Sequence, residues 1–185
     1  MRTQRCMTVA VVAGTLALAL PCAGWAKANK TGAAAKPSAS SAQFMRNAAV
    51  GGMAEVKLGK LAEERASRDD VKSFGKRMVD DHSKANDELK NLASEKDVTL
   101  PSDVDAKHKS VYDRLSKLSG PAFDRAYMDA MVKDHHEDVA EFQKAARSAD
   151  DPDVKGFASR TLPTLEEHMS EAQRIASGGS TRSAR

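Results

Sequence analysis

Four ionisable residues stand where the helical repeat of the sequence predicts buried, apolar side chains: Glu55, His82, His135 and His168. Burying such groups costs free energy unless they are paired or bound to a metal. Imidazole and carboxylate groups are ligands of iron, manganese, zinc and copper in proteins. The residues therefore predict a site for one transition-metal ion. A polar layer that fixes the register of the helices and binds no metal is the alternative.

The elements that must position these residues are helices, because apolar residues recur with a helical period and no segment is typical of a strand. The period predicts four long helices, at about residues 41–66, 67–96, 121–148 and 152–176, and a shorter one between about 102 and 118. Each long helix has one of the four polar residues near its middle. Midpoints coincide in a bundle whichever way the helices run, so we expect the four side chains in one layer.

These elements predict an all-α fold, an antiparallel four-helix bundle with a short additional helix between helices 2 and 3. The segment MVDDH at 78–82 recurs as MVKDH at 131–135, which indicates two helix pairs of common design. Ser67 is expected to cap the second helix. Gly51, Gly52 and Gly75 are expected where helices approach closely, because each costs its helix about 1 kcal/mol.

Two aspartates directly precede histidines of the predicted layer, Asp81 before His82 and Asp134 before His135. A neighbouring residue points about 100° away on a helix. We therefore expect Asp81 and Asp134 to lie behind the metal ligands and to accept a hydrogen bond from an imidazole of another helix, which fixes its tautomer. The other two histidines, His108 and His136, are expected at the surface.

Residues 1–26 are typical of a signal peptide. Arg2 and Arg5 precede an uncharged run from Val9 to Leu20, and small residues stand at Gly24 and Ala26. Twelve residues are too few to cross a hydrocarbon core of about 30 Å as a helix. The sequence thus predicts export, to the periplasm or to an association with the outer membrane, with a retained membrane anchor as the alternative.

Cleavage after Ala26 would remove both cysteines, Cys6 and Cys22, which excludes disulfides, thiolate catalysis and cysteine-bound zinc from the mature chain. It would also remove two positive charges from a net charge of only +3, so nucleic acid is not an expected partner. The predicted organisation is a signal peptide at 1–26, a flexible linker at 27–42, the bundle at 43–176 and a disordered tail at 177–185.

Segments of all four long helices resemble a known bacterial exported family, called domain of unknown function 4142. They read FMRNAAVGGMAEVKLGKLAEERA, VKSFGKRMVDDHSKANDEL, FDRAYMDAMVKDHHEDVAEF and FASRTLPTLEEHMSEA, within residues 43–175. The resemblance implies a ferritin-like bundle and no established activity. Ferritin-like di-iron enzymes have a glutamate three residues before each ligand histidine. Here Val79, Val132 and Leu165 stand at those positions, so a mononuclear site, or none, fits better than a dinuclear one.

The expected function is therefore that of an exported envelope protein that binds a single transition-metal ion, iron, manganese, zinc or copper. A redox or stress role follows by analogy of fold alone. The sequence has no glycine-rich phosphate loop, no Gly-x-Ser-x-Gly and no His-Glu-x-x-His, so an enzyme is not favoured. The alternative is a non-catalytic helical structural or interaction module of the cell envelope.

Overall fold

The computed structural model describes residues 36–178, which form helices and their connections and contain no strand. The elements are α1 (Ala39–Arg65), α2 (Asp69–Glu95), α3 (Ala106–Leu115), α4 (Gly120–Ser148) and α5 (Pro152–Ala176). The predicted all-α class is confirmed, and the bounds of the long helices agree with prediction within two residues. The predicted signal peptide lies outside the described residues, as do most of the linker and tail. Because α1 begins at Ala39, the last four residues of the predicted linker are helical.

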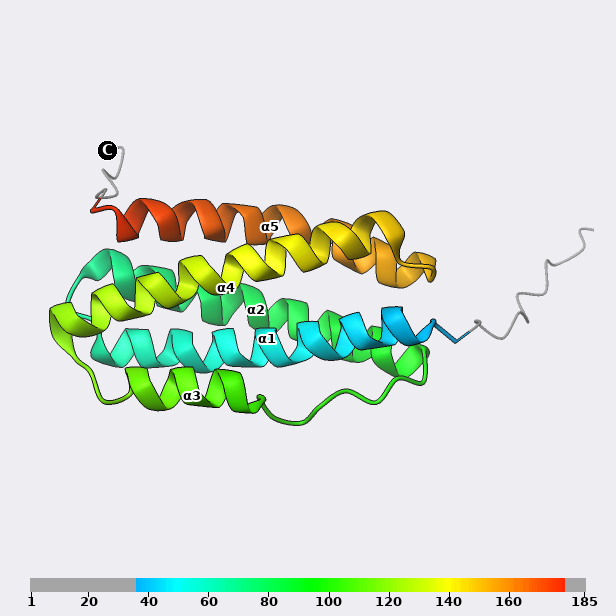
Figure 1. The fold of residues 1–185 in the computed structure, drawn as a ribbon, viewed down its shortest axis with the longest axis horizontal. Helices are drawn as coiled ribbons and strands as arrows, with labels where there is room; N and C mark the ends of the chain where they lie inside the picture. The colour runs from blue at the N-terminus through cyan, green and yellow to red at the C-terminus, as the bar shows by residue number, and fades with distance from the viewer. Residues whose placement is uncertain (1–35, 179–185) are drawn as a thin grey trace, which may run out of the picture. The chain divides into compact units, whose positions relative to one another are not determined.

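The four long helices form an antiparallel bundle of the ferritin-like kind. In Figure 1, α1 and α5 run in one direction, and α2 and α4 run in the other. Helix α1 packs on α2 and α4 packs on α5, and these two hairpins meet through α1 with α4 and α2 with α5. Since α2 and α4 are parallel, the chain must return along the bundle between them. That crossover carries α3, which packs on α1 and α4.

Side chains of Ser38, Asp105 and Asp151 cap α1, α3 and α5 by accepting hydrogen bonds from backbone N–H groups of the first turn. The predicted cap of α2 by Ser67 is wrong. The backbone N–H groups of Ser67 and Arg68 both donate to the carboxylate of Asp124, at 2.9 and 3.2 Å. Asp124 is a buried residue of α4, so a tertiary contact holds the chain just before α2, whose first turn has no side-chain cap.

The apolar core consists of two clusters, one toward each end of the bundle. The first gathers Leu58, Phe74, Tyr127 and Ile175, and the second gathers Phe44, Leu89, Phe142 and Phe157, each with further neighbours. Along every long helix the predicted polar residue falls between its contributions to the two clusters. Burial of one such apolar side chain stabilises by about 1.5–3 kcal/mol. The two clusters therefore supply the stability that a polar layer between them costs.

Helices α1 and α2 cross closely at two glycines. A Cβ atom on Gly75 would lie 2.7 Å from Cβ of Ala62 and 2.8 Å from the carbonyl oxygen of Gly59. A Cβ on Gly59 would lie 2.5 Å from the carbonyl oxygen of Gly75. These are contacts with backbone and with a side chain that has no freedom to move, so the prediction of a close approach at Gly75 is confirmed.

We expect Gly75→Ala to lower the free energy of unfolding by about 1–3 kcal/mol, because overpacking outweighs the gain of about 1 kcal/mol in helix propensity. The matched control is Gly156→Ala in α5, whose Cβ would meet only the flexible end of Arg160, at 3.1 Å. That change should be neutral or slightly stabilising. Urea unfolding of both variants checks the prediction, and equal effects would contradict it.

Candidate metal centre

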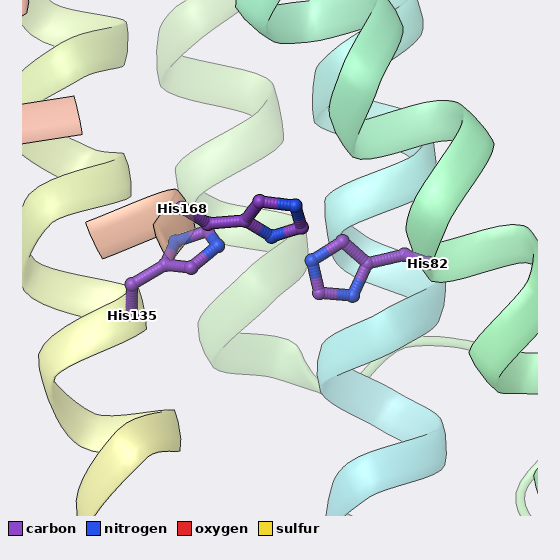
Figure 2. Close-up of side chains that lie close together, drawn as sticks. All are labelled: His82, His135 and His168. Atoms are coloured by element: carbon purple, nitrogen blue, oxygen red, sulfur yellow. The ribbon is translucent and has the colours of Figure 1, made fainter. Parts of the chain in front are cut away.

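Three histidines from three helices converge at the middle of the bundle. Figure 2 shows the imidazoles of His82 (α2), His135 (α4) and His168 (α5) pointing toward one another. One ring nitrogen of each lies within 4.8 Å of the other two, and the ring centroids are 5.4–5.8 Å apart. All three side chains are buried. The structure thus brings together the three histidines that the sequence placed in one layer.

The nitrogens that face this centre have no hydrogen-bond partner among residues 36–178. They are Nε2 of His82, Nε2 of His135 and Nδ1 of His168. In two of the rings the opposite nitrogen is engaged: Nδ1 of His135 donates to the carbonyl oxygen of Met131 at 3.0 Å, and Nε2 of His168 donates to Oδ2 of Asp81, also at 3.0 Å. Each of these bonds fixes the proton on the outer nitrogen and leaves a lone pair aimed at the centre.

The three rings have lowered pKa values, so they are neutral at neutral pH. Burial, and then the neighbouring His168, lower the pKa of His135 to about 4. Burial also sets the pKa of His82 well below its usual value, with His135 and His168 adding to the effect. For His168, burial and then Arg77 lower the pKa, against the opposing effect of Asp81. Neutral imidazole is the form that binds metal ions.

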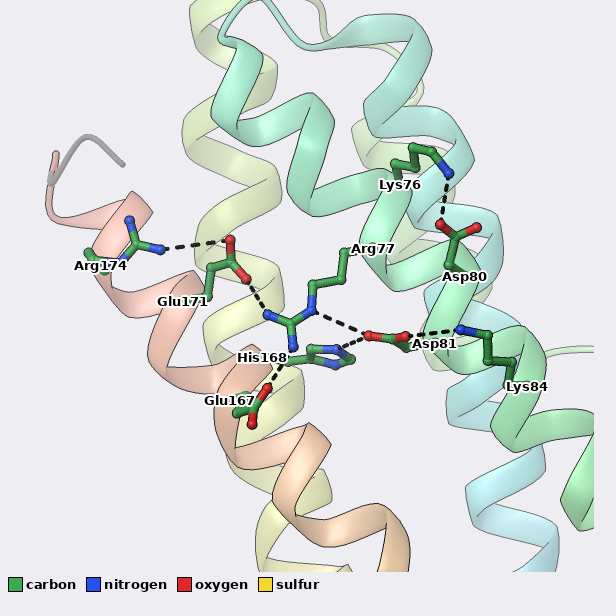
Figure 3. Close-up of polar contacts among 9 residues, drawn as sticks. All are labelled: Lys76, Arg77, Asp80, Asp81, Lys84, Glu167, His168, Glu171 and Arg174. Carbon is green, nitrogen blue, oxygen red and sulfur yellow. Dashed lines mark hydrogen bonds and ion pairs between the residues drawn. The ribbon is translucent and has the colours of Figure 1, made fainter. Parts of the chain in front are cut away.

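Behind His168, a group of charged side chains joins α2 to α5 (Figure 3). The guanidinium of Arg77 donates to Asp81 at 3.3 Å, and to Glu167 and Glu171 of α5 at 2.8 Å each. Burial would raise the pKa of Asp81, but the hydrogen bond from His168 and then Arg77 outweigh it and lower the pKa. Asp81 is therefore held as a carboxylate that accepts a hydrogen bond from His168 of another helix, the contact that the sequence predicted.

A pocket of about 240 Å³ lies beside the three histidines on the α2–α5 side. His82 and His168 line it, together with Asp81, Lys84, Glu88 and Arg160. His168 has no exposed surface and His82 is only 5% exposed, so the pocket ends against these two rings and the inward-facing nitrogens stay buried.

Glu55, the fourth predicted ligand, is completely buried but lies elsewhere. Its Oε1 is 3.6 Å from Nδ1 of His135, the nitrogen that faces Met131 rather than the centre. Its carboxylate lies instead beside the carboxylates of Asp134 and Asp138. The structure thus corrects the expected ligand arrangement. The position of a residue along a helix fixes its height in the bundle, but not on which side of a neighbouring ring it lies.

Asp134 also differs from expectation. Its Oδ1 lies 3.7 Å from Nε2 of His108 and 3.9 Å from Nζ of Lys107, both of α3, and among the described residues no histidine of the centre donates to it. His108, predicted at the surface, is half-buried there, with Nδ1 2.6 Å from Asp105. Helix periodicity carries no signal for where the crossover packs, so this contact was not predictable. His136 is exposed, as predicted.

Sequence reasoning missed two residues of this region, Arg77 and Asp138. Asp138 follows Asp134 by four residues, so both lie on one face of α4. Burial, and then the charge of Asp134, raise the pKa of Asp138 to about 7. Arg77 precedes Asp81 by four residues in the same way. The i, i+4 spacing was the available signal for both residues.

We expect the metal-free protein to depend on pH through His135. The folded ring has a pKa near 4 and an unfolded one near 6.5, so between these values the unfolded chain binds more protons and stability falls with falling pH. Glu55 and Asp138 act in the opposite sense, because their pKa values are raised in the folded state. The contribution of His135 is therefore measured by comparing how the unfolding free energies of wild type and His135→Gln change with pH.

Between pH 7 and pH 5, His135→Gln should lose about 2 kcal/mol less unfolding free energy than the wild type. Urea unfolding at the two pH values, in the presence of a chelator, measures this. His136→Gln, which removes the exposed neighbour, should follow the wild type. Parallel behaviour of wild type and His135→Gln would show that His135 is not buried in its neutral form.

Comparison with known proteins supports the fold. The sequence profile of a family described as Domain of unknown function (DUF4142) matches residues 26–175. Among solved structures, a crystal structure of a DUF305 fragment from Deinococcus radiodurans has a TM-score of 0.69 at 13% sequence identity, and the alignment covers 77% of this chain and 99% of the fragment. That likeness concerns the fold alone. No curated protein has a matching sequence.

Proposed function

We propose that this chain, which belongs to the DUF4142 family, binds one transition-metal ion through His82, His135 and His168. The observation that carries the proposal is the convergence of three buried imidazole nitrogens without hydrogen-bond partners in the described part of the chain. Leaving a buried acceptor unsatisfied costs about 1–3 kcal/mol. Three unsatisfied nitrogens in one place would add up to a large free-energy cost, and a bound cation would remove that cost.

The donor set indicates the class of metal. Three neutral nitrogens suit zinc, copper or iron better than the harder magnesium or calcium ions. Ligand nitrogens at 2.0–2.1 Å from a tetrahedral metal stand about 3.4 Å apart. The three nitrogens, within 4.8 Å of one another, need only a small contraction to reach that distance. Asp81 would then be the carboxylate that orients a ligand histidine from behind, an arrangement common in metal sites.

We also propose that residues 1–26 direct export of the protein to the cell envelope. The pattern of those residues, with Arg2 and Arg5 before the uncharged run from Val9 to Leu20, supports this. Among the described residues no helix is long and apolar enough to cross a membrane. A redox or stress role would follow from the metal by analogy of fold.

We expect the purified protein, stripped with chelator and incubated with iron, manganese, zinc or copper in turn, to retain about one equivalent of at least one of them. The double variant His82→Gln/His135→Gln should lose it. The matched control is His136→Gln, which removes the exposed histidine next to His135. Elemental analysis after desalting gives the stoichiometry. Less than about a tenth of an equivalent for every metal would leave the three histidines as a polar layer of a structural module.

Removal of the carboxylate behind His168 should weaken the site without removing a ligand. We expect Asp81→Ala to lower the metal affinity by about 10- to 100-fold. Asp80→Ala is the control, since Asp80 is the adjacent residue, exposed and paired only with Lys76 among the described residues. Competition against a chromophoric chelator measures both affinities, and equal affinities would contradict the role of Asp81.

A further inference from the structure

A second group of ionisable side chains lies on the other side of His135 from the three histidines. It consists of Glu55 from α1 and of Asp134 and Asp138, one turn apart on α4. One carboxylate oxygen of each lies within 4.8 Å of the other two. The group is separate from the histidine centre, because the contact between them joins Glu55 to the outer nitrogen of His135.

Glu55 is the reason to regard this group as a site rather than as an acidic surface. Its side chain has 0% exposure, and neither of its oxygens has a hydrogen-bond partner among residues 36–178. Oδ2 of Asp134 is also buried and unpartnered within that part of the chain. An unpaired buried carboxylate is costly, and two more beside it increase the cost.

The positive charges nearby do not reach the middle of the group. Lys107 and His108 approach Asp134 from α3, but both lie near Oδ1, at 3.9 and 3.7 Å, and not near Oδ2. Lys107 is moreover bound to Glu137 at 2.6 Å. Among the described residues, no positively charged side chain therefore reaches the space between Glu55 and the two aspartates.

Asp138 also borders the backbone of α1 and a small cavity. Asp138 lies against the backbone of α1, where a Cβ on Gly51 would be 3.6 Å from its Oδ1. A cavity of about 20 Å³, room for about one water molecule, borders Asp138 on its side toward Gly52 and His82 and is lined by neither Glu55 nor Asp134.

We propose that Glu55, Asp134 and Asp138 bind one small, oxygen-preferring divalent cation, Mn²⁺ or Mg²⁺, at a site distinct from the three histidines. All-carboxylate ligands are those that such ions prefer, and calcium generally takes more oxygens than this group offers. Oxygen ligands at about 2.1 Å from an octahedral ion lie within about 4.2 Å of one another, close to the spacing found here. This site goes beyond the proposed function and does not depend on it.

Mn²⁺ is the probe, because the electron paramagnetic resonance signal of the free ion disappears when it binds. Titration of the purified full chain should show one Mn²⁺ site. Asp138→Asn should weaken it at least tenfold, and Glu55→Gln should do the same. The control Asp129→Asn changes an exposed acid of the same helix and should bind as the wild type does. Circular dichroism checks that each variant is folded, and removal of a buried charge should not impair folding.

The two sites are separated by a crossed comparison. His82→Gln should keep its Mn²⁺ affinity within about twofold, and Asp138→Asn should keep its capacity for zinc or copper. If Mn²⁺ does not bind at 1 mM, or binds equally to wild type and to Asp138→Asn, the proposal is overturned and protons neutralise the carboxylates instead. Loss of Mn²⁺ binding in His82→Gln would likewise overturn it, because the ion would then sit among the histidines.

Discussion

The bundle depends on one constraint: ionisable side chains are buried at its middle and must be satisfied there. Apolar clusters flank this layer on either side. Hydrogen bonds fix the orientation of two of these groups: His168 donates to Asp81, and His135 donates to the Met131 carbonyl oxygen. Polar partners of this kind tolerate no shift of one helix turn, whereas apolar contacts tolerate several alternatives. The layer therefore selects one register for the helices.

Much of the fold follows from the sequence because each long helix is amphipathic and its ends are well marked. The three histidines were predictable for the same reason, since one falls on the buried stripe near the middle of each of three helices. Glu55 satisfied the same criteria but joined a different group. Its place depends on the rotation of α1 and on the approach of α4, and neither is encoded in the pattern of a single helix. Asp124, which binds the start of α2 from α4, was beyond local reasoning for a similar reason.

The two copies of the internal repeat, at 78–82 and 131–135, have similar sequences but different neighbours in the bundle. Asp81 and Asp134 occupy equivalent positions before equivalent histidines. Asp81 faces α5, where it meets His168 and is held by Arg77. Asp134 faces α1 and the crossover, where it meets Glu55 and His108. The long helices repeat one another more closely than their connections do, and only Asp134 has residues of the crossover helix α3 beside it.

The division of the bundle into two hairpins has a consequence for the lifetime of anything bound between the histidines. His82 belongs to the α1–α2 hairpin, and His135 and His168 belong to the α4–α5 hairpin. An ion held by all three would tie the hairpins together across their interface, in parallel with the ion pairs of Arg77. Its escape would require the hairpins to part between two packed apolar clusters. Residence time at such a centre is governed by the opening of the protein more than by the strength of any single bond to a ligand.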